Sequence, residues 1–288
     1  MKEHIEELEK RSNKGREDYV KEVLTRLETP FRIQRVNGWF VSGKNIIVDY
    51  PFSRRLQRDE KVILLCAHHN KWFRSPGAND NGSGVAVLLE FLQRLKEKQP
   101  KNIFLRVVFF AYEDGGAVLL GSRKYVKKYG VNDLEAVYNI DHVGAGDTLV
   151  CFPAPIEARS EHSLETVARA AKRKGFQVTY GLGLNLFQVS DHMPFQKAGL
   201  QQAYTLTVMS ERDSEKLFPP RKILNPFTFV YYYIFRMSTI KATEVFGIPR
   251  SYLHYHNKND RAEFLQEFVL GRVLDTVCEA IMIDRQGF

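Results

Sequence analysis

Apolar runs alternate with helical stretches through the first half of the chain, and this pattern constrains the fold more than any other feature. Apolar runs bounded by turn residues are typical of buried strands, and strands that alternate with helices predict a largely parallel sheet wrapped by those helices. The predicted strands cover residues 62–67 (VILLCA), 103–112 (IFLRVVFFAY) and 136–140 (AVYNI), and the predicted helices cover 84–98 and 121–130. The expected fold is therefore α/β, with a central mixed, largely parallel sheet flanked by helices.

The rest of the chain continues this pattern without a clear division. The sequence has no internal repeat, low-complexity tract or Gly/Ser linker. The further predicted elements are a helical region over 4–27 with a polar break at 12–15, a hairpin turn at Asn37-Gly38, a helix at 161–174, a strand at 203–209 and a final helix at 261–283. We expect one domain over 1–288, with an aromatic-rich insertion at about 211–252 that could cap a site, form an oligomer interface or pack into the core.

Composition narrows the classes of function. Hydrophobic residues make up 44% and charged residues 26% of the 288 residues, as in ordinary globular proteins. The N-terminus is charged and lacks an apolar signal segment, and the apolar run at 227–235 is too short to cross a bilayer, so we expect a cytoplasmic protein with no membrane partner. The net charge is +8, but the basic residues are scattered in short groups, which argues against a nucleic acid partner.

The three cysteines, Cys66, Cys151 and Cys278, have no CxxC spacing and are expected to be buried, reduced thiols.

Side chains able to bind metals or transfer protons follow three successive strands. His68 follows the first, Glu113-Asp114 follow the second in VVFFAYEDGG, and Asp141 follows the third. Taken singly, each is more often a turn or cap residue. Because parallel strands present their carboxyl ends along one rim, where α/β proteins bind ligands, we expect the set to lie together. The adjacent acids Glu113 and Asp114 repel each other, so something should compensate them.

Two other stretches carry similar residues. Asp80 lies at the centre of PGANDNGSG, whose glycines permit a close approach of the backbone. Asp80 or Ser83 could simply begin the following helix, but that does not explain the whole stretch. His256 in YHNKND is followed four residues later by Asp260, which suits a metal ligand beside a supporting acid, although a lone histidine is more often structural.

The donor set contains imidazoles and carboxylates but no thiolate. Such donors suit zinc in a catalytic site, with manganese or cobalt as substitutes. Two dications would offset the crowded acids and need a bridging carboxylate, while a carboxylate left unligated could take a proton from water. The candidates are His68, Asp80, Glu113, Asp114, Asp141 and His256.

These stretches resemble the co-catalytic zinc aminopeptidases, a family that includes bacterial leucyl aminopeptidase and aminopeptidase S and has glutamate carboxypeptidase II and the glutaminyl cyclases as relatives. The similarity covers residues 45–210 and 253–283 in order, and PGANDNGSGVA is its most specific element. The resemblance implies a zinc-peptidase-like catalytic domain over 1–288 that holds two zinc ions. It also implies hydrolysis of the N-terminal residue from a peptide substrate with a free N-terminus.

The resemblance further implies a role for each candidate. One ion would be bound by His68 and Asp141, the other by Asp114 and His256, and both would be bridged by Asp80. Glu113 would be the general base. Asp191, in VSDHMPF, would support the site from behind the ligands, although a helix N-cap is an equally good interpretation.

Three departures from the family pattern stand in the sequence. Asn70 takes the place of an aspartate that orients the first histidine, so His68 would be held only through a neutral amide. Asp114 replaces the second of two paired glutamates and is one methylene shorter. The stretch GGAVLLGS is about two residues longer than usual. We therefore hypothesise weaker metal binding or a different preferred metal, and a zinc affinity equal to that of an Asn70→Asp, Asp114→Glu double variant would remove this hypothesis.

Two other functions fit the same fold. One is a glutaminyl cyclase-like acyltransferase with a single zinc, and the other is a metal-free binding protein. The six chemically competent residues favour the peptidase over both. The sequence leaves the preferred N-terminal residue and the oligomeric state open, and a homodimer is compatible with it.

Overall fold

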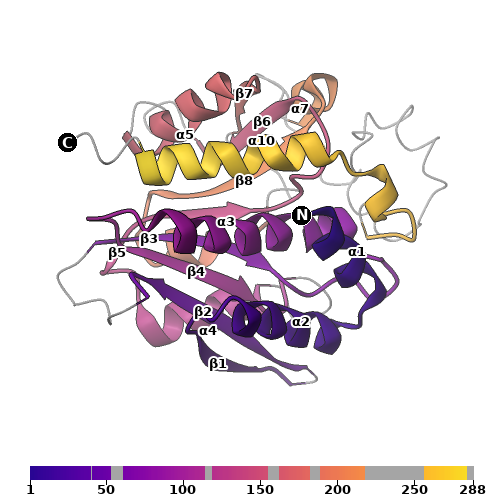
Figure 1. The fold of residues 1–288 in the computed structure, drawn as a ribbon, viewed down its shortest axis with the longest axis vertical. Coiled ribbons are helices and arrows are strands. Elements are labelled where there is room, and N and C mark those ends of the chain that lie inside the picture. Colours follow the sequence, from indigo (N-terminus) through magenta and orange to yellow (C-terminus); the bar gives the residue numbers. More distant parts are fainter. Residues whose placement is uncertain are drawn as a thin grey trace.

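Helices cover both faces of a sheet in the computed structural model, which describes residues 1–39, 41–52, 61–113, 119–154, 162–181, 189–217 and 256–283 (Figure 1). The strands are β1 (Arg32–Asn37), β2 (Ser42–Tyr50), β3 (Val62–His68), β4 (Leu105–Phe110), β5 (Leu134–Ile140), β6 (Thr148–Phe152), β7 (Gln177–Tyr180) and β8 (Ala203–Met209). The helices are α1 (Lys2–Lys10), α2 (Asn13–Arg26), α3 (Gly84–Lys98), α4 (Leu120–Tyr129), α5 (His162–Arg173), α6 (Met193–Lys197), α7 (Glu211–Leu217) and α10 (Glu267–Cys278).

Within the described residues the strands form one eight-stranded mixed sheet in the order β1-β2-β4-β3-β5-β8-β6-β7. The four central strands are parallel, and in their register Leu65 of β3 lies opposite Val107 of β4 and Tyr138 of β5. Antiparallel pairs, β2 with β4 and β6 with β8, continue the sheet on both sides. The predicted fold class is confirmed, and the carboxyl ends of the central strands lie on one rim.

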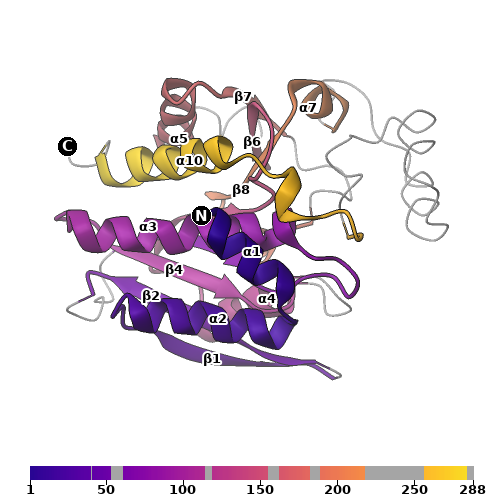
Figure 2. The ribbon, with the colours of Figure 1, turned by 45° about the vertical axis from the view of Figure 1, so that its right-hand side comes forward.

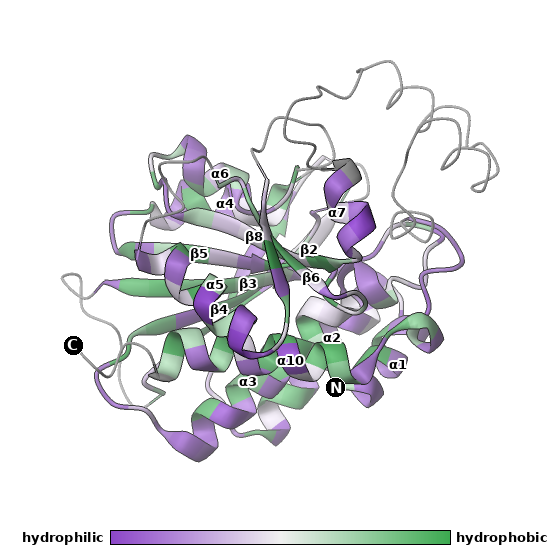
Figure 3. Cartoon of the chain, turned by 90° about the horizontal axis from the view of Figure 1, so that it is seen from above, coloured by the Kyte–Doolittle hydropathy of each residue, from purple (hydrophilic) through white to green (hydrophobic). Residues whose placement is uncertain are grey.

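Two hydrophobic clusters hold the layers together. On one face of the sheet, Leu88 of α3, Val167 of α5 and Val273 of α10 belong to a large buried cluster, and α10 runs beside α3 (Figure 2). On the other face, Tyr125 of α4 and Phe195 of α6 pack against β3, β4 and β5. Seen from above, the largely hydrophobic strands lie between these helical layers (Figure 3). The rim formed by the carboxyl ends of the central strands thus belongs to a sheet that is buried on both faces, as parallel sheets usually are.

The predicted elements are confirmed, with differences at their ends. The first helical region divides at Ser12, whose Oγ accepts a hydrogen bond from the Gly15 backbone nitrogen at the start of α2. Asn37 and Gly38 lie in the hairpin between β1 and β2. The final α-helix begins at Glu267 and not at residue 261. Ala262–Phe264 form a separate 3-10 turn, whose Ala262 backbone nitrogen donates to Glu9 Oε2 (2.7 Å), and Leu265 and Gln266 are extended before α10 begins. Strands β6 and β7 and helix α6 were not expected.

Several expectations concern residues that the structure does not describe. Of the insertion at about 211–252, α7 is described, and residues 218–252 lie outside the described residues, as does Asp114. The three cysteines are buried and free, as predicted. None of the helices in the described part of the chain combines the length and the apolar character needed to cross a membrane.

Candidate functional site

The carboxyl ends of β3, β4 and β5 bring three of the predicted site residues together. His68 Nε2 lies 2.8 Å from Glu113 Oε2 and 3.6 Å from Asp141 Oδ1. His68 and Glu113 are almost fully buried, and the side chain of Asp141 is 13% exposed. The parallel register that aligns the strand ends therefore places an imidazole and two carboxylates in one cluster, as the sequence predicted.

Asp80 joins this cluster from the loop that precedes α3, and imidazoles surround its carboxylate. Asp80 Oδ1 lies 3.2 Å from His68 Nε2, and Asp80 Oδ2 lies 3.1 Å from His256 Nε2. A third imidazole, that of His142, has its Nε2 3.5 Å from Asp80 Oδ1. The Trp72 ring stacks on the His256 ring at 4.5 Å between centroids and 9° between planes, which fixes the orientation of that imidazole.

The spacing and the chemistry of these groups fit a divalent cation. Two ligand atoms of a tetrahedral zinc ion, each about 2.1 Å from the metal, lie roughly 3.4 Å apart. The nitrogen–oxygen distances of 3.1–3.6 Å around Asp80 and Asp141 match that separation. Asp80 Oδ2, Glu113 Oε2 and Asp141 Oδ1 are buried and have no hydrogen bond of regular geometry, although an imidazole nitrogen lies 3.1, 2.8 and 3.6 Å from them, respectively. Because buried carboxylate oxygens need compensation, a bound cation is the partner that this donor set fits.

The loop around Asp80 depends on glycine. Gly77 has φ +69°, and a Cβ there would lie 2.6 Å from Arg16 Nη1 and 2.9 Å from the Asp80 carbonyl oxygen. A Cβ on Gly84 would lie 2.2 Å from the Ile140 carbonyl oxygen at the end of β5. Only glycine permits this approach, which confirms the interpretation of PGANDNGSG as a close-packed backbone.

The polar residues of the same loop bind it to the end of β5. The Asn81 side chain donates to the Ile140 carbonyl (2.8 Å) and accepts from the Gly84 backbone nitrogen (2.9 Å). Asn79 Oδ1 accepts from the Gly144 backbone nitrogen (2.8 Å), and Ser83 Oγ accepts from that of Val143 (3.1 Å). Asp80 is thereby held against the loop that carries Asp141.

Asp260 holds the Asp80 backbone. Its two carboxylate oxygens accept hydrogen bonds from the backbone nitrogens of Asn79 (2.6 Å) and Asp80 (3.0 Å). The sequence placed Asp260 beside His256 as a supporting acid. The structure shows that its support reaches the cluster through the Asp80 loop.

Asn70 acts through different atoms from those the sequence suggested. The backbone carbonyl of Asn70, not its amide, lies 3.1 Å from His68 Nδ1. The Asn70 side-chain oxygen instead accepts a hydrogen bond from the Glu113 backbone nitrogen (3.0 Å). One residue therefore positions both the imidazole of His68 and the backbone of Glu113.

Two further contacts position Asp141, which follows β5, and Asp191, which lies just before α6. Ser190 Oγ donates to Asp141 Oδ2 (3.2 Å) and itself accepts a hydrogen bond from the Asn139 side chain (2.6 Å). Asp191 is fully buried and accepts a hydrogen bond from Ser122 Oγ of α4 (2.5 Å). Asp191 thus lies behind the cluster, where the sequence analysis expected it to support the site.

The environment shifts the pKa values of Glu113 and Asp80 in opposite directions. Burial, reinforced by the charges of Asp191 and Asp141, raises the pKa of Glu113 well above its usual value, although His68 opposes the shift. Burial would also raise the pKa of Asp80, but the imidazoles of His142, His256 and His68 lower it well below its usual value. Such a separation is typical of sites in which one carboxyl group transfers protons and another stays ionised.

Sequence reasoning left two neighbours of the cluster out of the candidate set. Neither His142 nor Trp72 was among the predicted site residues. A signal for His142 was available, because it directly follows Asp141 in NIDHVG. No sequence pattern pointed to Trp72, whose contact with His256 joins residues far apart in the chain.

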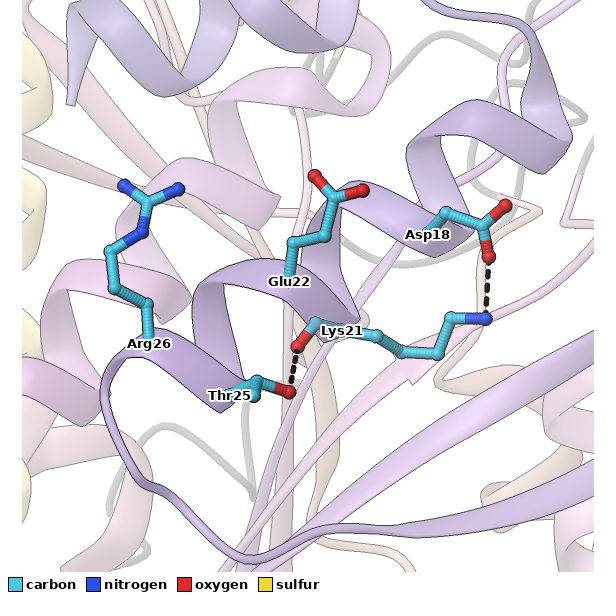
Figure 4. Close-up of a pocket in the computed structure, with 5 residues that line it drawn as sticks. All are labelled: Asp18, Lys21, Glu22, Thr25 and Arg26. Atoms are coloured by element: carbon cyan, nitrogen blue, oxygen red, sulfur yellow. Dashed lines mark hydrogen bonds and ion pairs between the residues drawn. The ribbon is translucent and has the colours of Figure 1, made fainter.

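A separate pocket lies on the outer side of α2 (Figure 4). Its lining residues all come from that helix, and Lys21 Nζ pairs there with Asp18 Oδ1 at 2.6 Å. These side chains form a solvated ion-pair face. The pocket holds none of the cluster residues, and the metal-ligand chemistry therefore belongs to the rim of the sheet.

Comparison with known proteins agrees with this geometry. The chain is 34% identical to aminopeptidase YwaD of Bacillus subtilis over 147 residues, which make up 49% of this chain and 31% of YwaD. A solved zinc aminopeptidase from Bacillus subtilis has a TM-score of 0.57 at 24% identity, covering 83% of this chain and 49% of its own. Porphyromonas gingivalis glutaminyl cyclase has a TM-score of 0.65 at 22% identity, covering 93% and 88%. At these identities the two structures establish the fold.

The family assignment rests on the extent of the match. The pattern of peptidase family M28 matches residues 45–281, which include His68, Asp80, Glu113, Asp141 and His256. The chain belongs to peptidase family M28.

Proposed function

We propose that this protein is a zinc-dependent aminopeptidase that removes the N-terminal residue from peptides. His68, Asp80, Asp114, Asp141 and His256 would hold two zinc ions, with Asp80 between them, and manganese or cobalt would fit the same donors. Bound zinc supplies a Lewis acid for the scissile carbonyl and lowers the pKa of a water molecule from about 15.7 towards about 7.

Glu113 is the proton carrier in this proposal. Its Oε2 is buried, has no hydrogen bond of regular geometry and lies beside His68, so it can take a proton from water and return it to the leaving amine. Asn70 fixes the Glu113 backbone, and Asp191 lies behind the cluster and adds negative charge that strengthens the base. Asp80 keeps its charge among three imidazoles and serves as a ligand.

The observation that carries the proposal is the convergence on Asp80 and Asp141. Ligand atoms from four separate segments lie 3.1–3.6 Å apart, and three buried carboxylate oxygens have no hydrogen bond of regular geometry. Packing alone gives no reason to bury so many ionisable groups together. Sites that bind two metals and hydrolyse peptides need this donor chemistry.

The role of Glu113 is tested by Glu113→Gln, which keeps the shape and removes the proton acceptor. We expect turnover of aminoacyl anilides to fall at least about 100-fold, while metal analysis finds the wild-type zinc content. Glu165→Gln, on the exposed side of α5, is the control and should retain full activity. Substantial turnover by the Glu113 variant would reject the assignment.

The reaction class is tested with wild-type protein and two kinds of substrate. A panel of aminoacyl anilides should be hydrolysed, and a peptide with N-terminal glutamine should not be cyclised. Cyclisation alone would identify an acyltransferase, and inactivity with no bound metal would identify a binding protein. The panel would also reveal the preferred N-terminal residue. The cytoplasmic location and the oligomeric state stay predictions, for cell fractionation and sedimentation to test.

A further inference from the structure

We propose that His142 is an additional metal ligand of this chain, binding the same cation as Asp80 and Asp141. The inference rests on the metal site of the proposed function and adds a ligand that the family resemblance did not supply. It concerns only which side chains hold the metal.

The first support is the position of the imidazole. His142 Nε2 lies 3.5 Å from Asp80 Oδ1, close to the separation of two ligand atoms on one zinc ion. One ligand atom each from Asp80, Asp141 and His142 lies within 4.8 Å of the other two. The His142 side chain is 19% exposed, so it borders the cluster and stays within reach of solvent ions.

The second support is the backbone that holds the imidazole there. His142 has φ +56°, a left-handed conformation that is unfavourable for most residues other than glycine. Its carbonyl accepts hydrogen bonds from the Val208 backbone nitrogen and from Thr207 Oγ1, both at 3.1 Å. The next residue, Val143, is tied to Ser83 Oγ in the loop that carries Asp80. Contacts with β8 and with the Asp80 loop therefore maintain a costly conformation that keeps His142 at the cluster.

The competing explanation is a simple ion pair, in which a protonated His142 offsets Asp80 and Asp141. The two explanations make opposite predictions for metal binding. A ligand contributes to zinc affinity, so its removal weakens binding. An imidazolium repels an incoming cation, so its removal leaves binding unchanged or strengthens it.

Ligation by His142 also has a consequence for metal choice. A further imidazole moves the donor set towards zinc and cobalt and away from manganese, which prefers oxygen ligands. Removal of His142 should therefore lower the ratio of zinc affinity to manganese affinity. A charge partner would have no such selective effect.

The experiment compares wild type with His142→Asn, since asparagine tolerates a left-handed backbone. His142→Gln is the second variant, should the first fail to fold, and thermal unfolding in chelator confirms that each is folded. The matched control is His162→Asn, an exposed imidazole on α5. The measurements are competitive zinc and manganese titrations of metal-free protein, and the visible absorption spectrum of the cobalt-loaded protein.

We expect the His142 variants to bind one zinc ion at least about tenfold more weakly, since removing even a residue that only orients a ligand costs 10–100-fold. The cobalt spectrum should change with the loss of a nitrogen ligand, while the His162 control matches wild type. Unchanged or tighter zinc binding with an unchanged cobalt spectrum would overturn the proposal.

The outcome is separable from that of the proposed function. If the wild-type protein hydrolyses no peptide but replacement of His142 weakens zinc binding, the aminopeptidase proposal is overturned and the assignment of His142 as a ligand stands. Active wild-type protein whose metal binding is independent of His142 would overturn the ligand alone.

Discussion

At the scale of single residues, Asn70 shows what a sequence can and cannot reveal. Its residue type predicted a neutral amide beside His68. The structure places the Asn70 backbone carbonyl on His68 and its amide oxygen on the Glu113 backbone. Residue type determines which hydrogen bonds are available, but the fold decides which partners come within reach. The same limit applies to His142, whose approach to Asp80 depends on the backbone after β5.

The Asn70 contact predicts a specific loss of stability. Asn70→Ala leaves the buried Glu113 backbone nitrogen without its acceptor, which should lower the free energy of unfolding by about 1–3 kcal/mol. Urea unfolding of metal-free protein measures this, with the exposed Asn132→Ala as control, which should change it by less than about 0.5 kcal/mol. Equal effects of the two substitutions would show that the bond to Glu113 contributes nothing.

At the scale of elements, α1 and α2 bind the loops that carry the cluster, although both helices precede residue 45, where the family match begins. Asn13 of α2 and the Lys71 backbone exchange two hydrogen bonds, of 2.8 and 3.2 Å, beside the His68 loop. Glu9 of α1 contacts Ala262 near His256, and α1 lies beside these loops (Figure 2). The spacing of apolar residues predicted both helices but could not show this role, since the contacts depend on polar side chains meeting distant backbone.

Arg16 of α2 should make a measurable contribution to the stability of the protein around the Asp80 loop. It is fully buried in α2, and its Nη2 donates to the Gly77 carbonyl (2.7 Å) under the Asp80 loop. Burial lowers the pKa of Arg16 to about 10, against the opposing charges of Asp260 and Asp80, so it stays charged at neutral pH. Arg16→Met should therefore lower the free energy of unfolding by about 1.5–3 kcal/mol.

The same substitution should speed amide hydrogen exchange at residues 78–82 more than in the strands. Arg26→Met, at an exposed position of the same helix, is the control and should stay within about 0.5 kcal/mol of wild type. If exchange rises uniformly along the chain, Arg16 supports the fold in general and has no special effect on the loop.

At the scale of the whole molecule, the sequence predicted the central parallel strands and the β1–β2 hairpin well, and the β6–β7 side of the sheet poorly. The buried runs of β3, β4 and β5 are long and apolar, and the helical stretches between them predicted that they run parallel, although not that β3 lies between β4 and β5. Strand β7 has four residues, none of them buried, so no apolar period marks it. Its pairing with β6 depends on contacts between distant parts of the chain. The site was nevertheless predictable, because it lies at the ends of the strands that the sequence identifies best.

Metal binding should stabilise the whole domain, because the cluster joins segments from residue 68 to residue 256. Zinc at 100 times its dissociation constant adds about 2.7 kcal/mol, and each kcal/mol raises the thermal midpoint of a large domain by roughly 2–4 °C. The thermal midpoints measured by calorimetry with zinc and with chelator should therefore differ by about 5–10 °C.

Each scan should show one transition if residues 1–288 form the single domain that we propose. Glu113→Gln should keep this difference, whereas Asp80→Asn, which removes the charge between the imidazoles, should lose most of it. Two separate transitions would contradict the single domain, and equal midpoints with zinc and with chelator would contradict the metal site.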